Sequence, residues 1–153
     1  MKLKPEQLQQ VPSLLRSLAL FAGASDEQIQ ALVSGLDYLE YPKGKVLLME
    51  QEINRTLFIL SQGVVGIWKR VSGEKKQMAV LKAPDFFGEM SIFTESPATA
   101  LVKVEEDCKV FALSKAAFDA AAQKNPTLTA LIQKNIQDIK AKRPVISAPK
   151  PTE

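Results

Sequence analysis

Short apolar or alternating segments, separated by turn-forming residues, occupy the centre of this chain and constrain its fold most strongly. The connections between them include Pro42-Lys43-Gly44, Gln62-Gly63 and Ser72-Gly73-Glu74, which are typical of turns that join β-strands. The predicted strand segments are 36–41, 46–49, 57–60, 64–71, 76–82, 100–105 and 108–113. Short strands at this spacing predict an antiparallel sandwich or roll.

Helical patterns flank this central region on both sides. Val11 to Phe21 carries an apolar stripe at helical spacing, and Ser25 to Gln28 forms a capping box that starts a second helix, which Gly35 ends. After the strands, Ser114 is placed to cap a helix that runs to about Lys124. Asn125-Pro126 is predicted to begin the last helix. The predicted fold class is α+β, mainly β: an antiparallel β-roll or jelly roll flanked by N-terminal and C-terminal helices.

The last helix, predicted over residues 126–142, has one apolar face that allows two interpretations. It packs either into the core of the domain or against a partner protein. The face consists of Leu128, Leu131, Ile132, Ile136 and Ile139. Residues 143–153 contain prolines and no periodicity, so we expect a disordered tail after a single domain over residues 1–142.

Composition narrows the range of functions. The chain of 153 residues contains no histidine and one cysteine, Cys108, which begins an apolar run and is expected to be a structural thiol. Without histidine, Ser-His-Asp and Cys-His catalysis and nearly all zinc sites are excluded, so we expect neither an enzyme nor a metal site. The net charge of +3 does not by itself indicate nucleic-acid binding. Neither a secretion signal nor an apolar stretch of membrane-spanning length is present, so we expect a cytoplasmic protein with no membrane partner.

Residues 86–102 carry the most specific signal for function. They read Phe-Phe-Gly-Glu-Met-Ser-Ile-Phe-Thr-Glu-Ser-Pro-Ala-Thr-Ala-Leu-Val. The glycine permits a sharp turn into a short helix near Glu89, and the amides from Gly88 to Ser91 lack partners within that helix, so they could face an anion. The carboxylate of Glu89 is an acceptor of hydrogen bonds. Phe86 and Phe87 are expected to pack in the core.

This stretch resembles the phosphate-binding cassette of the cyclic-nucleotide-binding domain family, in which F-G-E is followed, after a short loop, by P-R. Over residues 14–142 the chain is similar to the sensor domains of bacterial catabolite-activator-type regulators. The resemblance implies that Glu89 accepts a hydrogen bond from a ribose 2′-hydroxyl and that Gly88, Ser91 and Thr99 line the phosphate and base. The expected ligand-binding residues are Phe87, Gly88, Glu89, Met90, Ser91, Ala98, Thr99 and Ala100.

Ala98 is the main departure from the family pattern, because it stands where the family carries the arginine that clamps the cyclic phosphate. A guanidinium and a phosphate often form a bidentate pair, and each of its charge-assisted hydrogen bonds contributes about 1.5–3 kcal/mol. Loss of the arginine is therefore expected to weaken phosphate binding by roughly two to four decades. Lys103 and Arg55 are the cations considered as replacements. Pro84 stands where the family often has glycine, which predicts a reshaped loop before the cassette.

Two functional hypotheses follow. The first is a stand-alone cyclic-nucleotide-binding-type regulatory or sensor module in which Ala98 weakens or abolishes binding of cAMP and cGMP; its ligand would be a nucleotide or related small molecule, and no cofactor is expected. The second is a degenerate domain that acts in protein–protein interaction or homodimerisation through the 126–142 helix. Bacterial regulators of this family usually continue into a helix-turn-helix, whereas few residues follow Arg143 here, so we expect no specific DNA binding.

Overall fold

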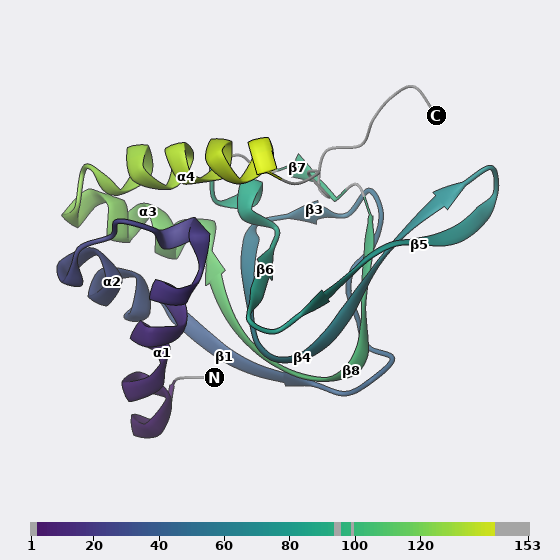
Figure 1. The fold of residues 1–153 in the computed structure, drawn as a ribbon, viewed down its shortest axis with the longest axis horizontal. Helices are drawn as coiled ribbons and strands as arrows, with labels where there is room; N and C mark the ends of the chain where they lie inside the picture. Colours follow the sequence, from purple (N-terminus) through teal and green to yellow (C-terminus); the bar gives the residue numbers. More distant parts are fainter. Residues whose placement is uncertain (1–2, 94–95, 99, 143–153) are drawn as a thin grey trace.

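The structure, a computed structural model, describes residues 3–93, 96–98 and 100–142 and consists of a β-roll with helices packed beside it (Figure 1). The helices are α1 (Pro5–Ser17), the 3-10 helix η1 (Ala19–Phe21), α2 (Asp26–Val33), the 3-10 helix η2 (Glu89–Ile92), α3 (Lys115–Lys124) and α4 (Leu128–Lys142). The strands are β1 (Leu36–Tyr41), β2 (Val46–Leu48), β3 (Ile53–Asn54), β4 (Thr56–Val71), β5 (Glu74–Lys82), β6 (Asp85–Phe87), β7 (Ser96–Pro97) and β8 (Leu101–Ser114).

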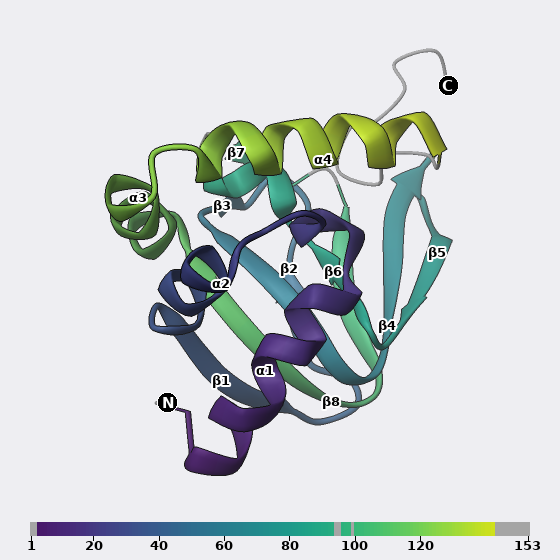
Figure 2. The same ribbon diagram turned by 60° about the vertical axis from the view of Figure 1, so that its left-hand side comes forward.

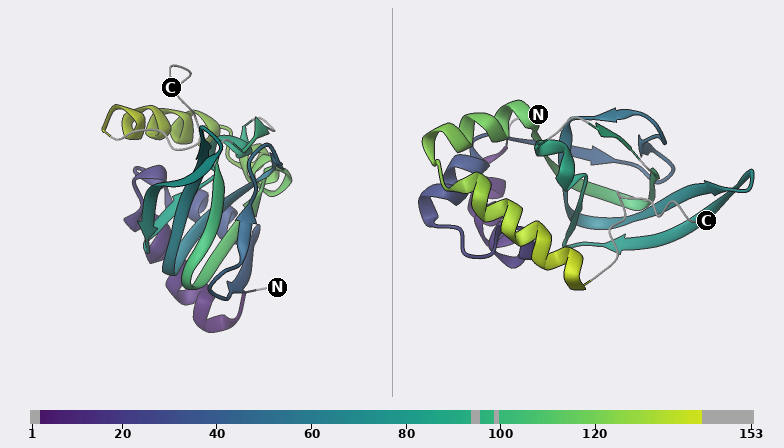
Figure 3. Two further views of the ribbon diagram at one scale, coloured as in Figure 1. Left: turned by 90° about the vertical axis from the view of Figure 1, so that its right-hand side faces the viewer. Right: turned by 90° about the horizontal axis from the view of Figure 1, so that it is seen from above.

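All the strand pairs are antiparallel, which confirms the predicted fold class. In the described residues, the larger sheet has the order β1-β8-β4-β5, with β2 also paired to β8 and β6 to β4, while β3 and β7 form a separate pair. Figure 3 shows the curved sheet from the side and from above. The central pair, β4 and β8, extends from Thr56 opposite Ser114 to Trp68 opposite Leu101, with shifts of register between Leu60 and Val65.

Two strands are longer than the sequence predicts. The segments 57–60 and 64–71 are both parts of β4, and 100–105 and 108–113 both contribute to β8. The predicted turn at Gln62-Gly63 is wrong, because the register of β4 against β8 shifts there without the strand ending. Gly63 has a φ of +102°, and a Cβ atom at this position would lie 2.4 Å from the carbonyl oxygen of Asp107. The glycine therefore permits a β-bulge, which bends a strand without ending it.

The first two helices follow the prediction in part. α1 ends at Ser17 because Leu18 is extended, with a ψ of 134°, and the apolar stripe continues through η1, where Leu20 and Phe21 are buried. The predicted capping box of α2 is confirmed. The amide of Gln28 donates to Oγ of Ser25 over 3.1 Å, and the amide of Ser25 donates to Oε1 of Gln28 over 2.8 Å.

The boundary between the last two helices differs from the prediction. Ser114 caps α3 as expected, since its side chain accepts a hydrogen bond from the first turn. Asn125 does not begin α4: its amide donates to the carbonyl of Ala121, which closes α3. A turn over residues 125–127 separates the helices, with the amide of Leu128 donating to the carbonyl of Asn125 over 2.9 Å. That prediction was wrong because the amide of Asn125 still donates to the carbonyls of Ala121 and Ala122, so this residue ends α3 instead of starting α4.

Two apolar clusters fill the molecule, and β4 contributes to both. Because successive side chains of a strand point to opposite faces, Leu57 and Ile59 join the helical core, which lies beneath α1–α4, whereas Phe58 and Leu60 join the roll interior. Figure 2 shows α1 and α2 over one face of the sheet. The roll interior consists of Leu48, Phe58, Leu60, Val65, Ile67, Leu81, Phe87, Ala100, Val102, Val104, Cys108 and Val110.

α4 is anchored to the N-terminal helices. The buried Asn135 donates to the carbonyls of Leu20 and Ala22, both over 2.9 Å, and Nε2 of Gln28 donates to Oγ1 of Thr127 over 3.1 Å. The apolar face is buried at Leu128, Ile132 and Ile136 and half-buried at Leu131 and Ile139. The structure thus confirms the core interpretation of this face. A partner interface on α4 stays a prediction. Of the helices in the described ranges, none is long and apolar enough to cross a bilayer.

Candidate ligand site

The cassette begins at β6, which holds two phenylalanines on opposite faces. Phe86 is buried in the helical core and Phe87 in the roll interior. Phe87 pairs with Phe58 across the strands, and their rings stack with centroids 4.9 Å apart. Both side chains pack in the core as the sequence predicts. A contact between Phe87 and a ligand stays a prediction.

Gly88 makes the turn that the sequence predicts between β6 and η2. Its φ is +80°, and a Cβ atom at this position would lie 2.7 Å from the carbonyl oxygen of Thr56 and 2.8 Å from Nδ2 of Asn54. A side chain here would be strained in its backbone and would also collide with β4. Glycine at this position is therefore a requirement of the packing as well as of the turn.

Asn54, which the sequence reading missed, holds the corner against which Gly88 packs. Its side chain is 6% exposed, donates to the carbonyl of Thr56 over 2.9 Å and accepts from the amide of Thr56 over 3.2 Å. A buried asparagine that clasps its own chain is a recognisable turn element. The available signal was the polar Asn54-Arg55 step just before an apolar run, but its burial depends on contact with Gly88.

The short helix expected near Glu89 is present as η2. Glu89 is its first residue and is half-buried. Met90 and Ser91 contribute their backbone to η2, but their side chains lie outside the described part of the chain, as does all of Thr99. Ala100 is buried in the roll interior. The structure brings Phe87 to Ser91 into one turn, and binding of an anion by their amides stays a prediction.

Ala98 is held by backbone hydrogen bonds and presents only a methyl group. Its amide donates to the carbonyl of Glu52 over 2.7 Å, and its carbonyl accepts from the amide of Gln51 over 2.8 Å, next to the pairing of β3 with β7. The half-buried side chain of Ala98 packs against the roll interior. The position that corresponds to the family's arginine therefore belongs to the wall of an apolar cluster.

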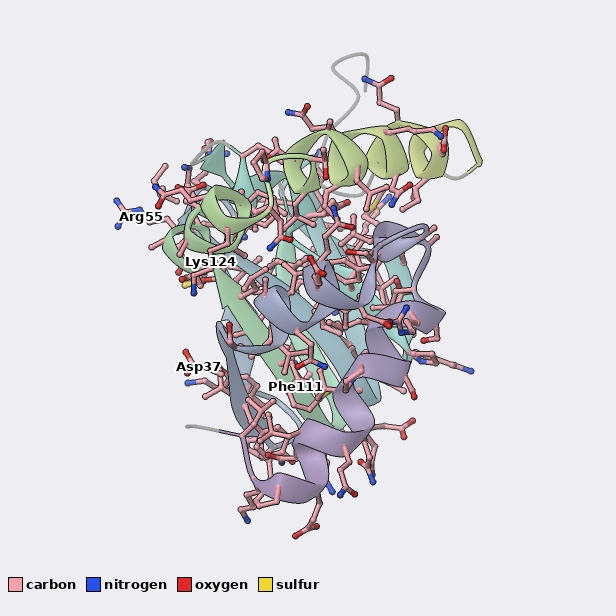
Figure 4. The ribbon with its side chains drawn as sticks, turned by 90° about the vertical axis from the view of Figure 1, so that its left-hand side faces the viewer. Asp37, Arg55, Phe111 and Lys124 are labelled. Atoms are coloured by element: carbon pink, nitrogen blue, oxygen red, sulfur yellow. The ribbon has the colours of Figure 1, made fainter. Side chains whose placement is uncertain are left out.

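Neither cation considered as a replacement faces the roll interior. Lys103 is exposed between the buried Val102 and Val104, so the alternation of β8 directs it outward. Arg55 is exposed too, and Figure 4 shows its side chain directed away from the body of the molecule. Among the described residues, the buried polar or charged side chains are Gln28, Asn54 and Asn135. No buried cation in these ranges takes the place of the arginine.

The loop that enters the cassette contains Pro84 after a cis peptide bond. The amide of Ala83 donates to the carbonyl of Gly63 over 3.2 Å, which ties the loop to the bulge of β4. The reshaping of this loop relative to the family stays a prediction.

The cassette contacts the C-terminal helices directly. Ile92, the last residue of η2, is buried in the helical core. The next residue, Phe93, meets Phe118 of α3 edge to face, with ring centroids 5.5 Å apart, and Phe118 is 2% exposed. A displacement of η2 would therefore press on α3, which in turn packs against α2 and α4.

Cys108 belongs to the roll interior and is structural, as the sequence predicts. It is 2% exposed, and its Sγ lies 3.1 Å from the carbonyl oxygen of Glu106. Burial raises the pKa of this thiol, so the reactive thiolate is disfavoured. A surface hollow of about 490 Å³ beside Cys108 contains none of the predicted ligand-binding residues; it is lined by Glu40, Tyr41, Pro42, Gln62, Asp107, Cys108 and Lys109.

Comparison with known proteins identifies related sequences. Residues 38–125 match the family description of the cyclic nucleotide-binding domain. The cyclic AMP receptor protein of Thermus thermophilus is 25% identical over 130 residues, which cover 84% of this chain and 58% of that protein. The human potassium/sodium hyperpolarization-activated cyclic nucleotide-gated channel 1 is 25% identical over 115 residues, 75% of this chain and 12% of the channel. The chain thus spans just over half of the first relative and a small part of the second.

Solved structures share the fold. The catabolite activator protein of Thermus thermophilus superposes with a TM-score of 0.70 at 25% identity, over 82% of this chain and 57% of that chain. A cyclic nucleotide-binding domain from Methylobacillus flagellatus gives a TM-score of 0.78 at 20% identity, over 90% of this chain and 78% of that chain.

Proposed function

The chain belongs to the cyclic nucleotide-binding domain family, and from this premise we propose that it is a regulatory or sensor module whose phosphate clamp is lost at Ala98. Ordinary cAMP and cGMP then bind weakly or not at all. The observation that carries the proposal is the methyl group of Ala98 on the apolar roll interior, at the position that corresponds to the family's arginine. The module binds and does not catalyse, and its expected location is the cytoplasm.

The expected loss of affinity for cyclic phosphates follows from the energy of the missing ion pair. A guanidinium makes a charge-assisted, often bidentate pair with a phosphate, and each such bond contributes about 1.5–3 kcal/mol. Without it, affinity falls by roughly two to four decades.

The rest of the cassette keeps its geometry. This favours a site that binds a ligand other than a cyclic phosphate, and it argues against a site that has collapsed. Gly88 keeps its positive φ and its close packing against Thr56, and η2 begins directly after it. Ligand binding at this turn would be transmitted through Phe93 to Phe118 and α3. The output of the module would then be a displacement of the C-terminal helices.

Calorimetric titration of the protein with cAMP and cGMP, beside the Ala98→Arg variant, tests this proposal. We expect no measurable heat of binding for the wild type and affinity gained by roughly two to four decades in the variant. Ala79→Arg is a matched control, because Ala79 is also half-buried against the roll interior but lies outside the cassette. It should gain no affinity.

Two results would contradict the proposal. Micromolar or tighter binding by the wild type would mean that another group supplies the clamp. A folded Ala98→Arg variant that binds no better than the wild type would mean that the pocket is lost for reasons other than Ala98. Folding of each variant is checked by its urea unfolding transition, so a misfolded protein is not mistaken for either result.

A further inference from the structure

We propose that the end of the β4–β5 hairpin is a docking element for duplex nucleic acid, inserted into a groove as a two-stranded ribbon that contacts phosphates on both sides. The basic ribbon comprises residues 69–76, Lys-Arg-Val-Ser-Gly-Glu-Lys-Lys. This surface lies outside the candidate ligand site, and the inference does not depend on the proposed function.

The basic ribbon carries charge equal to the whole net charge of the chain. It contains four basic residues and one acidic residue, or +3, and the chain has 20 basic and 17 acidic residues, also +3. The remaining 145 residues hold 16 of each sign, by subtraction of 4 from 20 and 1 from 17. The ribbon is therefore a strongly basic segment within a chain whose other residues balance in charge only as a sum.

The cations of the basic ribbon oppose one another across the strands. Lys69 lies opposite Lys76, and Arg70 lies opposite Lys75. Like charges in directly opposed positions destabilise a strand pair. Among the described residues, no ion pair joins a carboxylate to a cation of the ribbon. An anionic partner would relieve this repulsion.

The carboxylates of Glu50 and Glu105 hydrogen-bond to the ribbon and its base without forming an ion pair with its cations. The carboxylate of Glu50 accepts from the backbone amide of Arg70 over 3.1 Å, and the guanidinium of Arg70 donates to the neutral carbonyl of Gly73 over 3.1 Å. Glu105 accepts from the indole of Trp68 over 2.8 Å, at the base of the ribbon. Glu74 lies opposite Val71 in the register, so it does not pair across the strands with a cation.

The distribution of the cations favours a groove over a flat surface. Directly opposed residues share a face of the ribbon, so Lys69 and Lys76 occupy one face and Arg70 and Lys75 the other. A flat acidic protein or a lipid surface would meet one face, whereas the phosphate walls of a groove meet both.

The size of the projection fits as well. β4 leaves β8 after Trp68, and three further residues at about 3.3 Å each extend the ribbon by about 10 Å. The major groove of duplex DNA is about 8.5 Å deep and admits a two-stranded ribbon. Figures 1 and 3 show the hairpin projecting from the roll. The contacts proposed are to phosphates and read no sequence, so the expectation of no specific DNA binding is not in conflict with them.

The salt dependence of binding tests the proposal. Fluorescence anisotropy of a labelled mixed-sequence duplex of about 20 base pairs is measured with the intact chain at salt concentrations from about 50 to 200 mM. Four phosphate contacts predict a slope of log K against log salt of about −3 to −4. We expect Lys69→Gln/Lys76→Gln and Arg70→Gln/Lys75→Gln each to reduce the magnitude of this slope by about 1.8. Lys43→Gln/Lys109→Gln removes the same charge from exposed positions elsewhere and should leave the slope unchanged.

Several results would overturn the proposal. If the variant of one ribbon face alone accounted for all of the reduction in the salt slope, the partner would be a flat surface and not a groove. Equal loss in the Lys43→Gln/Lys109→Gln control would reduce the effect to net charge. Absence of duplex binding, with binding to phosphatidylserine-containing vesicles or to polyglutamate through the same residues, would assign the ribbon to another partner. If the ribbon variants self-associate and duplex binding is unaffected, the cations serve to protect an exposed strand edge.

Discussion

The two halves of the cassette are held in place by different forces. The first half, Phe87 to Ile92, is fixed by side-chain packing: Phe87 stacks on Phe58, and a side chain at Gly88 would collide with the backbone of Thr56. In the second half, Ala98 is held by hydrogen bonds from its own backbone to Gln51 and Glu52. Backbone pairing does not depend on side-chain identity. The chain can therefore keep the cassette's architecture while position 98 loses its charge.

Gly88→Ala should have the largest effect on stability, because it disrupts the first half of the cassette, which depends on side-chain packing. A non-glycine residue at positive φ costs about 1–3 kcal/mol, and overpacking against Thr56 adds about 1–3 kcal/mol. We expect the free energy of unfolding in urea to fall by about 2–6 kcal/mol in total.

Gly44→Ala is the control for this measurement. Gly44 also has a positive φ, of +96°, but a Cβ atom there meets nothing within 4 Å, so only the backbone strain of about 1–3 kcal/mol applies. If Gly88→Ala cost no more than Gly44→Ala, the contrast between the two halves of the cassette would be wrong.

Ala98→Arg should change the response to ligand and leave the fold in place. Ligand present at about 100 times its dissociation constant stabilises a protein by about 2.7 kcal/mol. We expect that increase in the unfolding free energy of Ala98→Arg when cAMP is added at such a concentration, and no change in the wild type. Ala98→Gln, similar in bulk but uncharged, should not respond. An equal response in Ala98→Gln would show that shape at position 98 matters more than charge.

Asn54→Ala probes the corner that supports the first half. The variant removes both hydrogen bonds to the backbone of Thr56 and leaves buried polar groups unsatisfied, at a cost of about 1–3 kcal/mol in unfolding free energy. Asn125→Ala is the comparison, because its side chain makes a long contact of 3.4 Å with the carbonyl of Ala121. A loss at Asn54 no larger than at Asn125 would argue against the supporting role.

The smallest expected effect is a pH dependence of stability that arises from Cys108 in the roll interior. Burial raises the pKa of Cys108 above its ordinary value of 9.0, so the thiol holds its proton in the folded chain after the unfolded chain has released it. Its stabilising contribution is complete below the unfolded pKa and declines as pH rises above about 9. Urea unfolding at neutral and alkaline pH should show a shallower decline for Cys108→Ala than for the wild type. Parallel declines in the two proteins would contradict this.

Features encoded by neighbouring residues were predictable. The capping box at Ser25, the cap at Ser114 and the turn at Ser72-Gly73 are as expected, because each depends on contacts a few residues apart. The strands β3, β6 and β7 were not predicted, since segments of two or three residues become strands only through distant partners. The bulge at Gly63 was mistaken for a turn for the same reason: the backbone of Asp107, which requires it, is far away in the sequence.

The sequence by itself determined that helices flank a central region of strands, the glycine turn into η2 and the family, because periodicity, capping and the cassette motif depend on residues close together in the chain. It also identified position 98 as alanine. Only the tertiary structure decided what surrounds that alanine. The pairing of β3 with β7 places its methyl group on the roll interior, and the alternation of β8 directs Lys103 outward. These outcomes depend on register between segments far apart in the chain, and a shift of one residue would reverse the face on which each side chain lies.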